Sequence, residues 1–207
     1  MTTITYPKNS DIVYLISHSP QNDRVNNVKQ QKGVTLVELM VTVSIVAIIL
    51  AFVAPSVQSI LIKNRIVAEI NETSSLIQYA RHHAIDEQAL VVVCPSADYS
   101  NCSTDWNDPK IVFIDDDANT IRGANEELLV SIGKTSQASV MTNTNAIIIF
   151  SETGEANLAT EILLCHKDGE AKYARALSVS LQGRVKMSSD SDRNGINENA
   201  AGTELSC

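Results

Sequence analysis

The chain has 207 residues, 44% hydrophobic and only 4% aromatic, so it is long enough for one packed domain whose core is mainly Val, Ile, Leu and Ala. The formal charge is −8; residues 1–32 hold four of the 16 bases and two of the 24 acids, which leaves 12 bases against 22 acids after them. Such an acidic body repels nucleic acid and anionic lipid at long range, which excludes general nucleic-acid binding unless a local basic patch is present.

The first predicted element is an apolar helix over residues 34–54. The segment has about the 20 residues that a helix needs to cross a bilayer, and Lys29 and Lys32 precede it. Because basic residues stay on the cytoplasmic side, the N-terminus is expected in the cytoplasm and the rest of the chain across the membrane. The membrane part is expected to extend to about residue 56.

Two residues of this segment are unusual for a plain membrane anchor. Glu38 places a carboxylate near the start of the apolar run, where a charge is costly unless it is paired. Pro55 removes a backbone hydrogen bond and clashes with the preceding turn, so it is expected to kink or weaken the helix. The simpler alternative is a signal-anchor helix with an incidental glutamate.

The helix is predicted to continue beyond the membrane as an amphipathic segment, so that the whole N-terminal helix covers residues 34–86. Apolar residues recur there at helical spacing and form one stripe, while the opposite face is charged. The C-terminal domain is expected to cover this stripe. Its members are Val57, Ile60, Leu61, Val67, Ile70, Ile77, Ala80 and Ala84.

Residues 87–207 are expected to form a globular, β-rich domain. Short runs of β-branched and apolar residues alternate there with clusters of Gly, Asn, Asp and Pro that favour turns. No helical segment separates the runs, which favours one antiparallel sheet or two small sheets packed on the helix, in the α+β class. The predicted strands cover residues 89–94, 111–114, 127–132, 146–150, 161–166, 174–181 and 184–187.

Four cysteines are present: Cys94, Cys102, Cys165 and Cys207. An even number in a chain with an export segment favours disulfides, and four cysteines allow three pairings. We favour Cys94–Cys102, which closes a short loop, and Cys165–Cys207, which fixes the C-terminus. The chain-entropy model gives these bonds about 2.5 and about 4 kcal/mol respectively. Free buried thiols are the alternative.

The junction before the apolar run has a specific pattern. Lys32-Gly33 is followed by Val34-Thr35-Leu36-Val37-Glu38, which resembles the leader end of a type IV prepilin or pseudopilin. The resemblance implies that residues 1–33 are a leader, that a membrane aspartic peptidase cuts between Gly33 and Val34, and that the new N-terminus is methylated. Val34 departs from the usual Phe at this position.

The resemblance also gives Glu38 and Pro55 a role. Glu38 becomes the fifth mature residue and Pro55 the twenty-second, and both match the family pattern. The partner of the Glu38 carboxylate is then the ammonium group that cleavage creates on a neighbouring subunit. This pairing is expected to fix the axial register of one helix on the next.

The C-terminal domain resembles the GspH/FimT family. The similar stretches are residues 106–115, residues 126–129, Phe150 to Gly154, and residues 175–186 with Gly183-Arg184. The resemblance implies a minor pilin that initiates assembly of a type IV pilus and associates with major and minor pilins. The alternative is the H-type pseudopilin of a type II secretion system, and a third reading is an envelope anchor without a filament role.

No enzyme is expected. The sequence contains no G-x-S-x-G, Walker loop or H-E-x-x-H motif. Scattered Ser, His and Asp residues do not define a catalytic triad. A structural subunit without a cofactor, calcium excepted, is therefore predicted.

A basic pair suggests a DNA-binding alternative. Arg184 and Lys186 are predicted on one face of a strand, within reach of adjacent phosphates. Some FimT-like minor pilins resemble this stretch with a G-R-x-R sequence that contacts DNA during natural transformation. Asp190, Asp192 and the acidic body oppose binding, and a strand end with solvated charges is the alternative.

An acidic turn suggests a calcium loop. Asp190, Asp192 and Asn194 precede Gly195 in a D-x-D-x-N-G pattern, with oxygens at the positions that calcium loops use. The carbonyl of Ile196 would be a further ligand. Ala201 stands at the twelfth position in place of the usual Glu, and Glu198 is the candidate substitute. A flexible acidic turn without a metal is the alternative.

Overall fold

The structure, a computed structural model, describes residues 33–207. The leader expected over residues 1–33 therefore lies outside the described residues, except for Gly33. The chain forms two compact units, one up to Val46 and one from Ala47 to the C-terminus, and each is described by itself. The described residues contain one long helix, eight strands and a short 3-10 helix, which confirms the predicted α+β class.

Helix α1 covers Leu36–Glu87. Its first turn is capped by Thr35, whose Oγ1 accepts a hydrogen bond from the N–H of Glu38 over 3.2 Å. Such a cap satisfies an N–H group that the first turn of a helix leaves without a partner. The helix continues without interruption through Pro55, so the kink expected there stays a prediction.

By length and composition, α1 qualifies as a helix that can cross a membrane. The large apolar side chains between Val34 and Val53 are exposed in the structure. An apolar surface of this extent is covered by lipid or by partners in a stable protein. The predicted membrane segment is thus consistent with the described residues, and its bounds stay a prediction.

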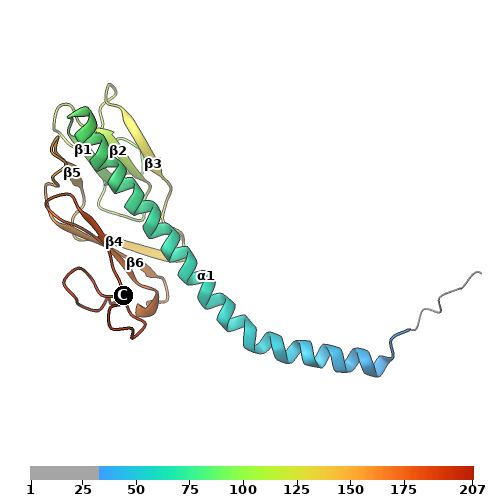
Figure 1. Ribbon diagram of the computed structural model, residues 1–207. Coiled ribbons are helices and arrows are strands. Elements are labelled where there is room, and N and C mark those ends of the chain that lie inside the picture. The colour runs from blue at the N-terminus through green and yellow to red at the C-terminus, as the bar shows by residue number, and fades with distance from the viewer. Residues whose placement is uncertain (1–32) are drawn as a thin grey trace, which may run out of the picture. The chain divides into compact units, whose positions relative to one another are not determined.

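The unit from Ala47 onward contains two antiparallel four-stranded sheets (Figure 1). The first sheet has the order β3-β2-β1-β5 and consists of β1 (Val91–Pro95), β2 (Lys110–Ile114), β3 (Leu128–Ile132) and β5 (Ile148–Phe150). The second has the order β4-β6-β7-β8 and consists of β4 (Ser139–Asn143), β6 (Thr160–His166), β7 (Arg175–Val179) and β8 (Val185–Met187). The 3-10 helix η1 (Ala171–Tyr173) precedes β7.

Seven strands fall on the predicted runs, and β4 is the one that the sequence analysis missed. Its residues, Ser-Val-Met-Thr-Asn, include no run of β-branched apolar residues. Ser139 and Met141 are nevertheless buried on one face, and all five residues pair with β6. Tertiary burial, not local propensity, therefore makes this segment a strand.

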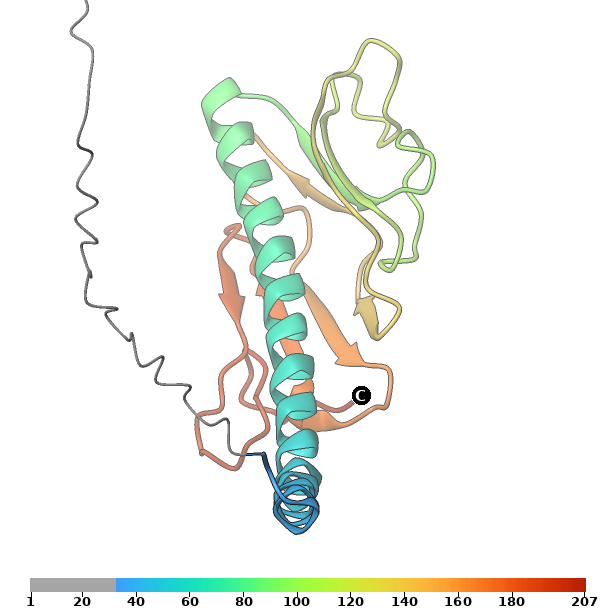
Figure 2. The same cartoon turned by 90° about the vertical axis from the view of Figure 1, so that its right-hand side faces the viewer.

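The C-terminal part of α1 packs against both sheets and forms the main core (Figure 2). Ile66, Ile70 and Ile77 are buried and contact residues of β1, β6 and β7. Burial of each such side chain contributes about 2 kcal/mol relative to exposure. One expectation is wrong: Val57, Ile60 and Leu61, the first members of the predicted stripe, are exposed, so the fully buried face of α1 begins only at Ile66.

Two glycine turns close against α1. Gly154 and Gly183 have φ angles of +78° and +72° and lie in the β5–β6 and β7–β8 connections. A Cβ on Gly183 would lie 2.0 Å from the carbonyl oxygen of Gly154 and 2.5 Å from Nε of Arg81. Arg81 donates from Nε to Gly154 O (2.9 Å) and from its terminal nitrogen to Gln182 O (3.3 Å). Glycine is thus needed at both turns because the backbones meet around this guanidinium.

A contact far from this end also ties the domain to the helix. The hydroxyl of Tyr173 donates to Oγ of Ser59 over 3.1 Å. Tyr173 is buried and its ring packs edge-on against His166. The domain is therefore attached to α1 from Ser59 to the end of the helix.

Candidate functional site

The expected processing and assembly residues lie at the start of α1. Val34 is exposed, and a Cβ built on Gly33 would meet no atom within 4 Å. Packing within the described residues thus gives no reason for glycine at this position. Glu38 lies in the first turn of α1, where the positive end of the helix dipole favours a carboxylate. The cap from Thr35 with Glu38 three residues later has the spacing of a capping box.

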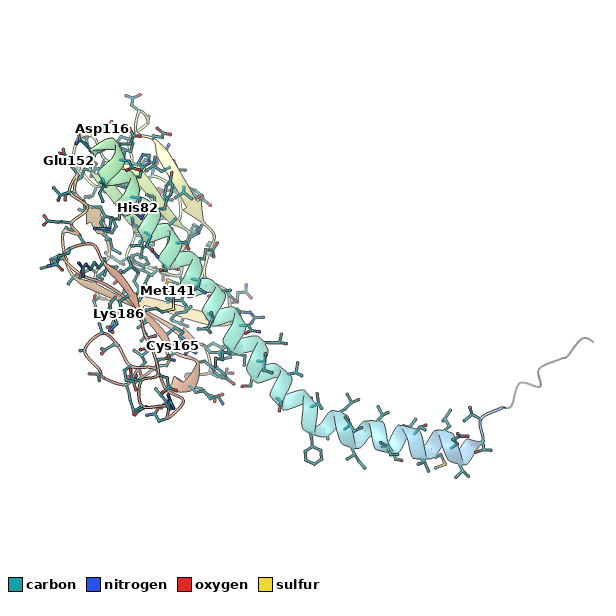
Figure 3. The ribbon with its side chains drawn as sticks, viewed as in Figure 1. His82, Asp116, Met141, Glu152, Cys165 and Lys186 are labelled. Carbon is teal, nitrogen blue, oxygen red and sulfur yellow. A yellow bond between two sulfur atoms is a disulfide. The ribbon has the colours of Figure 1, made fainter. Side chains whose placement is uncertain are left out.

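The cysteine pairing is confirmed. Cys94 is bonded to Cys102 and Cys165 to Cys207, with Cα–Cα distances of 5.6 and 5.8 Å. The first bond closes the loop after β1, and the second holds the C-terminus to β6, where Figure 3 labels Cys165. Both bonds lie beside small apolar clusters of the domain.

The structure places Arg184 and Lys186 on one open groove, as the alternation predicts. The groove has a volume of about 630 Å³ and lies over β6, β7 and β8. Lys186, labelled in Figure 3, pairs across the ladder with Ser178, and Ser178 pairs with Glu161. Both basic side chains are exposed. Glu161 in the same groove leaves two cations against one acid, so DNA binding stays a prediction.

The acidic turn brings Asp190, Asp192 and Glu198 together, with one carboxylate oxygen from each within 4.8 Å of the others. Asn194 lies beside this group: its Oδ1 accepts the N–H of Ile196 (2.8 Å) and its Nδ2 donates to Asp192 (3.0 Å). Glu198, the expected substitute for the glutamate at the twelfth position, is one of the three acids.

Backbone N–H groups donate hydrogen bonds to two of these carboxylates. Gly195 N–H donates to Asp190 over 3.0 Å. The N–H of Ser191 donates to Glu198 over 2.8 Å and lowers the pKa of that carboxyl. Internal hydrogen bonds alone suffice to order this turn, so calcium stays a prediction.

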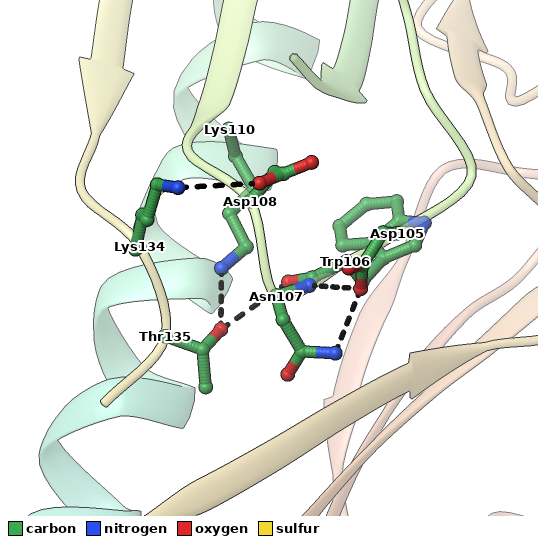
Figure 4. A network of polar contacts seen from close by, with 7 residues as sticks. All are labelled: Asp105, Trp106, Asn107, Asp108, Lys110, Lys134 and Thr135. Atoms are coloured by element: carbon green, nitrogen blue, oxygen red, sulfur yellow. Dashed lines mark hydrogen bonds and ion pairs between the residues drawn. The ribbon is translucent and has the colours of Figure 1, made fainter. Parts of the chain in front are cut away.

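A polar network around Lys110 has no recognisable signature in the sequence (Figure 4). The Lys110 side chain is 1% exposed, and its Nζ donates to Oγ1 of Thr135 over 2.7 Å, which in turn donates to the carbonyl of buried Trp106 over 3.2 Å. Burial lowers the pKa of Lys110 to about 8, while the nearby carboxylates of Glu69 and Glu72 on α1 oppose the shift. The network therefore joins α1, β2 and the β3–β4 connection.

Asn107 completes this network by fixing the edge of β4. Its side-chain Oδ1 accepts the N–H of Met141 (2.8 Å) and its Nδ2 donates to the Met141 carbonyl (3.2 Å). The amide thus replaces a neighbouring strand at this position. The Trp-Asn-Asp-Pro-Lys stretch at residues 106–110 has a structural role, joining the two sheets.

Comparison with known families gives two matches. Residues 69–183 match the model of the type II transport protein GspH, and residues 28–54 match the prokaryotic N-terminal methylation motif. The first match covers more than half of the chain and includes the α1–sheet core. The second includes Gly33, Val34 and Glu38. No curated protein matches the sequence.

Among solved structures, the fold is similar to that of the type IV minor pilin FimU of Pseudomonas aeruginosa strain PAO1. The similarity has a TM-score of 0.50 at 18% identity and covers 63% of this chain and 92% of the other. A second similar structure is the minor pseudopilin EpsH from the type 2 secretion system of Vibrio cholerae, with a TM-score of 0.41, 8% identity, and coverage of 58% and 93%.

Proposed function

Because this chain belongs to the GspH family and carries the N-terminal methylation motif in the same polypeptide, we propose that it is a minor pilin that helps to initiate assembly of a type IV pilus. The combination of the two matches supports the proposal: the methylation motif matches the apolar N-terminal segment, and the GspH model matches the end of α1 and the globular domain after it. The alternative is the H-type pseudopilin of a type II secretion system, with the same helix and domain.

Processing is the first step of the proposed function. A prepilin peptidase cuts between Gly33 and Val34, and the new amine is methylated. Within residues 33–207 no packing contact requires glycine at position 33, which supports this assignment, because recognition by the peptidase then explains the glycine. Before assembly, the protein is anchored in the inner membrane with the domain from residue 87 onward in the periplasm.

Assembly is the second step, and Glu38 controls it. The carboxylate pairs with the Val34 amine of a neighbouring subunit when α1 leaves the membrane. A charge pair in an apolar bundle is strongly disfavoured at any other register, because each group would then remain buried without a partner. Pro55 weakens the helix near the end of the apolar segment and allows adjustment during packing.

The experiment that tests the proposal is mass spectrometry of the mature protein from its native membrane. The expected N-terminal residue is Val34 carrying one methyl group. A protein that starts at any other residue would refute the processing step and the pairing that depends on it. Deletion of the gene, scored for loss of surface pili and for loss of secretion, then separates the pilus from the secretion system.

A further inference from the structure

The outer edge of β3 is open. In the order β3-β2-β1-β5, β3 is the terminal strand, and within residues 33–207 no strand pairs with its far side. The strand has the sequence Leu-Leu-Val-Ser-Ile, which contains no charge. An uncharged edge with free backbone groups is a template for pairing with a further strand, and proteins normally block such edges with charges, prolines or covering elements.

The register identifies the backbone groups that face outward. Asp115 N–H donates to the carbonyl of Leu90 over 2.9 Å, so by the alternation of an antiparallel ladder Ile111 bonds to β1 as well. Ser131 lies opposite Ile111 and therefore exchanges no ladder bond with β2. The N–H and C=O of Ser131 point away from the sheet, and its side chain is exposed.

A groove runs beside this edge. It has a volume of about 490 Å³ and lies between α1 and β3, lined by Glu72, Ser75, Leu76, Tyr79, Val130 and Ile132. Tyr79 is 44% exposed and stacks on His83 with ring centroids 5.9 Å apart. The walls are mostly apolar, with Glu72 as the only charged group in the lining.

We propose that this groove accepts an extended segment of another polypeptide, which adds to β3 as a fifth strand. A row of backbone donors and acceptors is matched by another extended backbone, and the neighbouring helix groove receives every second side chain of the added strand. The occupant therefore has apolar residues at alternate positions and a basic residue opposite Glu72. This surface is separate from the N-terminal helix contacts of the proposed filament, so the two proposals can fail independently.

A second copy of this chain does not fit the groove. Closed pairing of two β3 edges around a twofold axis is antiparallel, and the axis is normal to the joined sheet. Such an axis reverses the direction of the part of α1 that packs on the sheet, so the two copies of this part of α1 would run antiparallel, which does not suit two subunits anchored in one membrane. A strand from a different chain carries no such constraint.

The test measures binding of a fluorescent probe peptide, acetyl-Lys-Thr-Val-Thr-Val-Thr-amide, in which Lys and both Val residues lie on one strand face, to the full chain in detergent micelles by anisotropy. Ser131→Pro removes the outward N–H without removing a bond to β2, and Ser131→Ala is the matched control, which keeps that N–H. The same peptide with proline at its third position controls for binding by composition alone. Circular dichroism and the unfolding midpoint show that each variant is folded.

We expect saturable binding by the parent chain and by Ser131→Ala, at least tenfold weaker binding by Ser131→Pro, and no binding of the proline peptide. A second arm, Glu72→Gln, is expected to weaken binding of the Lys-containing peptide several-fold. The proposal is overturned if Ser131→Pro binds as well as the parent, if no saturable binding occurs at millimolar peptide, or if the chain pairs with itself in the absence of peptide.

Discussion

Nε of Arg81 donates a hydrogen bond to the carbonyl oxygen of Gly154 over 2.9 Å, and this bond joins helix α1 to the turn between β5 and β6. The second turn at the same place, around Gly183, approaches so closely that a methyl group would lie 2.0 Å from that carbonyl. Two of the stretches that resemble the GspH/FimT family, Phe150 to Gly154 and Gly183-Arg184, therefore meet at one arginine of the N-terminal helix. Their common role is structural: they hold the second sheet against α1.

Gly183→Ala is expected to lower the free energy of unfolding by about 3 kcal/mol or more, because it adds a backbone clash to the cost of a left-handed φ. Gly169→Ala is the matched control, since Gly169 has a φ of +73° but no atom within 4 Å of a built Cβ. The control is expected to cost about 1 kcal/mol. Urea unfolding of the full chain in micelles measures both, and equal losses would contradict the close-contact explanation.

Because Lys110 is buried, we expect the free energy of unfolding to rise with pH. Burial lowers its pKa from 10.5 to about 8 in the folded chain, so unfolding takes up a proton between these values and the free energy of unfolding rises from pH 8 to about pH 10.5. The rise is expected to reach about 3 kcal/mol and to be absent in Lys110→Met. Lys134→Met, which changes an exposed lysine nearby, is expected to keep it. Parallel pH profiles for all three proteins would show that Lys110 is not the source.

The two disulfides are expected to contribute unequally. Their sequence separations are 8 and 42 residues, and the chain-entropy model gives about 2.5 kcal/mol for the shorter loop and about 4 kcal/mol for the longer. Paired serine replacement of Cys165 and Cys207 should therefore lower the unfolding midpoint more than that of Cys94 and Cys102. The reverse order would mean that packing around Cys94, which is fully buried, dominates over loop length.

Glu38→Ala is expected to leave cleavage and methylation intact but to abolish incorporation into filaments. The cause is the loss of the only acid in the first turn of α1, without which the neighbouring amine has no partner. Glu87→Ala, at the other end of the same helix, is the control. Immunoblots of sheared filaments and of membranes measure both steps, and normal assembly of Glu38→Ala would refute the pairing mechanism.

The basic groove allows a direct test of DNA binding. If Arg184 and Lys186 bind phosphates, Arg184→Ala with Lys186→Ala should abolish salt-sensitive retention in a gel-shift titration, while Lys167→Ala should not. Glu161→Gln is expected to strengthen retention, because it removes the acid that shares the groove. Absence of retention by the parent chain at low salt would end this alternative.

Features with a local signature were predictable. The apolar run, Glu38 and Pro55 can be identified from their spacing alone. Helical periodicity likewise identifies Ile70, Ile77 and Ala84 as part of the buried face of α1. Seven strands follow from short β-branched runs. The cysteine pairing could be predicted because Cys94 and Cys102 are only 8 residues apart, so that a bond between them closes a short loop.

Features that depend on distant partners were not predictable. In the sequence, Arg81 is one more charged residue on the polar face of a helix. Only the fold shows that its hydrogen-bond partners, Gly154 and Gln182, lie 73 and 101 residues away. A lysine at the start of a strand, such as Lys110, is normally expected to be exposed to solvent. Lys110 is nevertheless buried and donates a hydrogen bond to Thr135. β4 lacks a strand signal because Asn107 and β6 supply what its side chains do not. In each case the missing information is a contact between residues that are far apart in the sequence.

The hydrogen bond between Tyr173 and Ser59 joins the C-terminal domain to α1 close to the predicted end of the membrane segment. Ser59 is the fifth residue after Ala54, and at 1.5 Å per helical residue that is about 8 Å of axial rise, comparable to the thickness of one headgroup layer. For a membrane segment that ends at Ala54, as predicted, the domain of a subunit in the bilayer is expected to lie near the headgroups. Helix α1 continues without a break from Ser59 to Glu87, so this part of the helix and the domain are expected to move together when a subunit enters a filament.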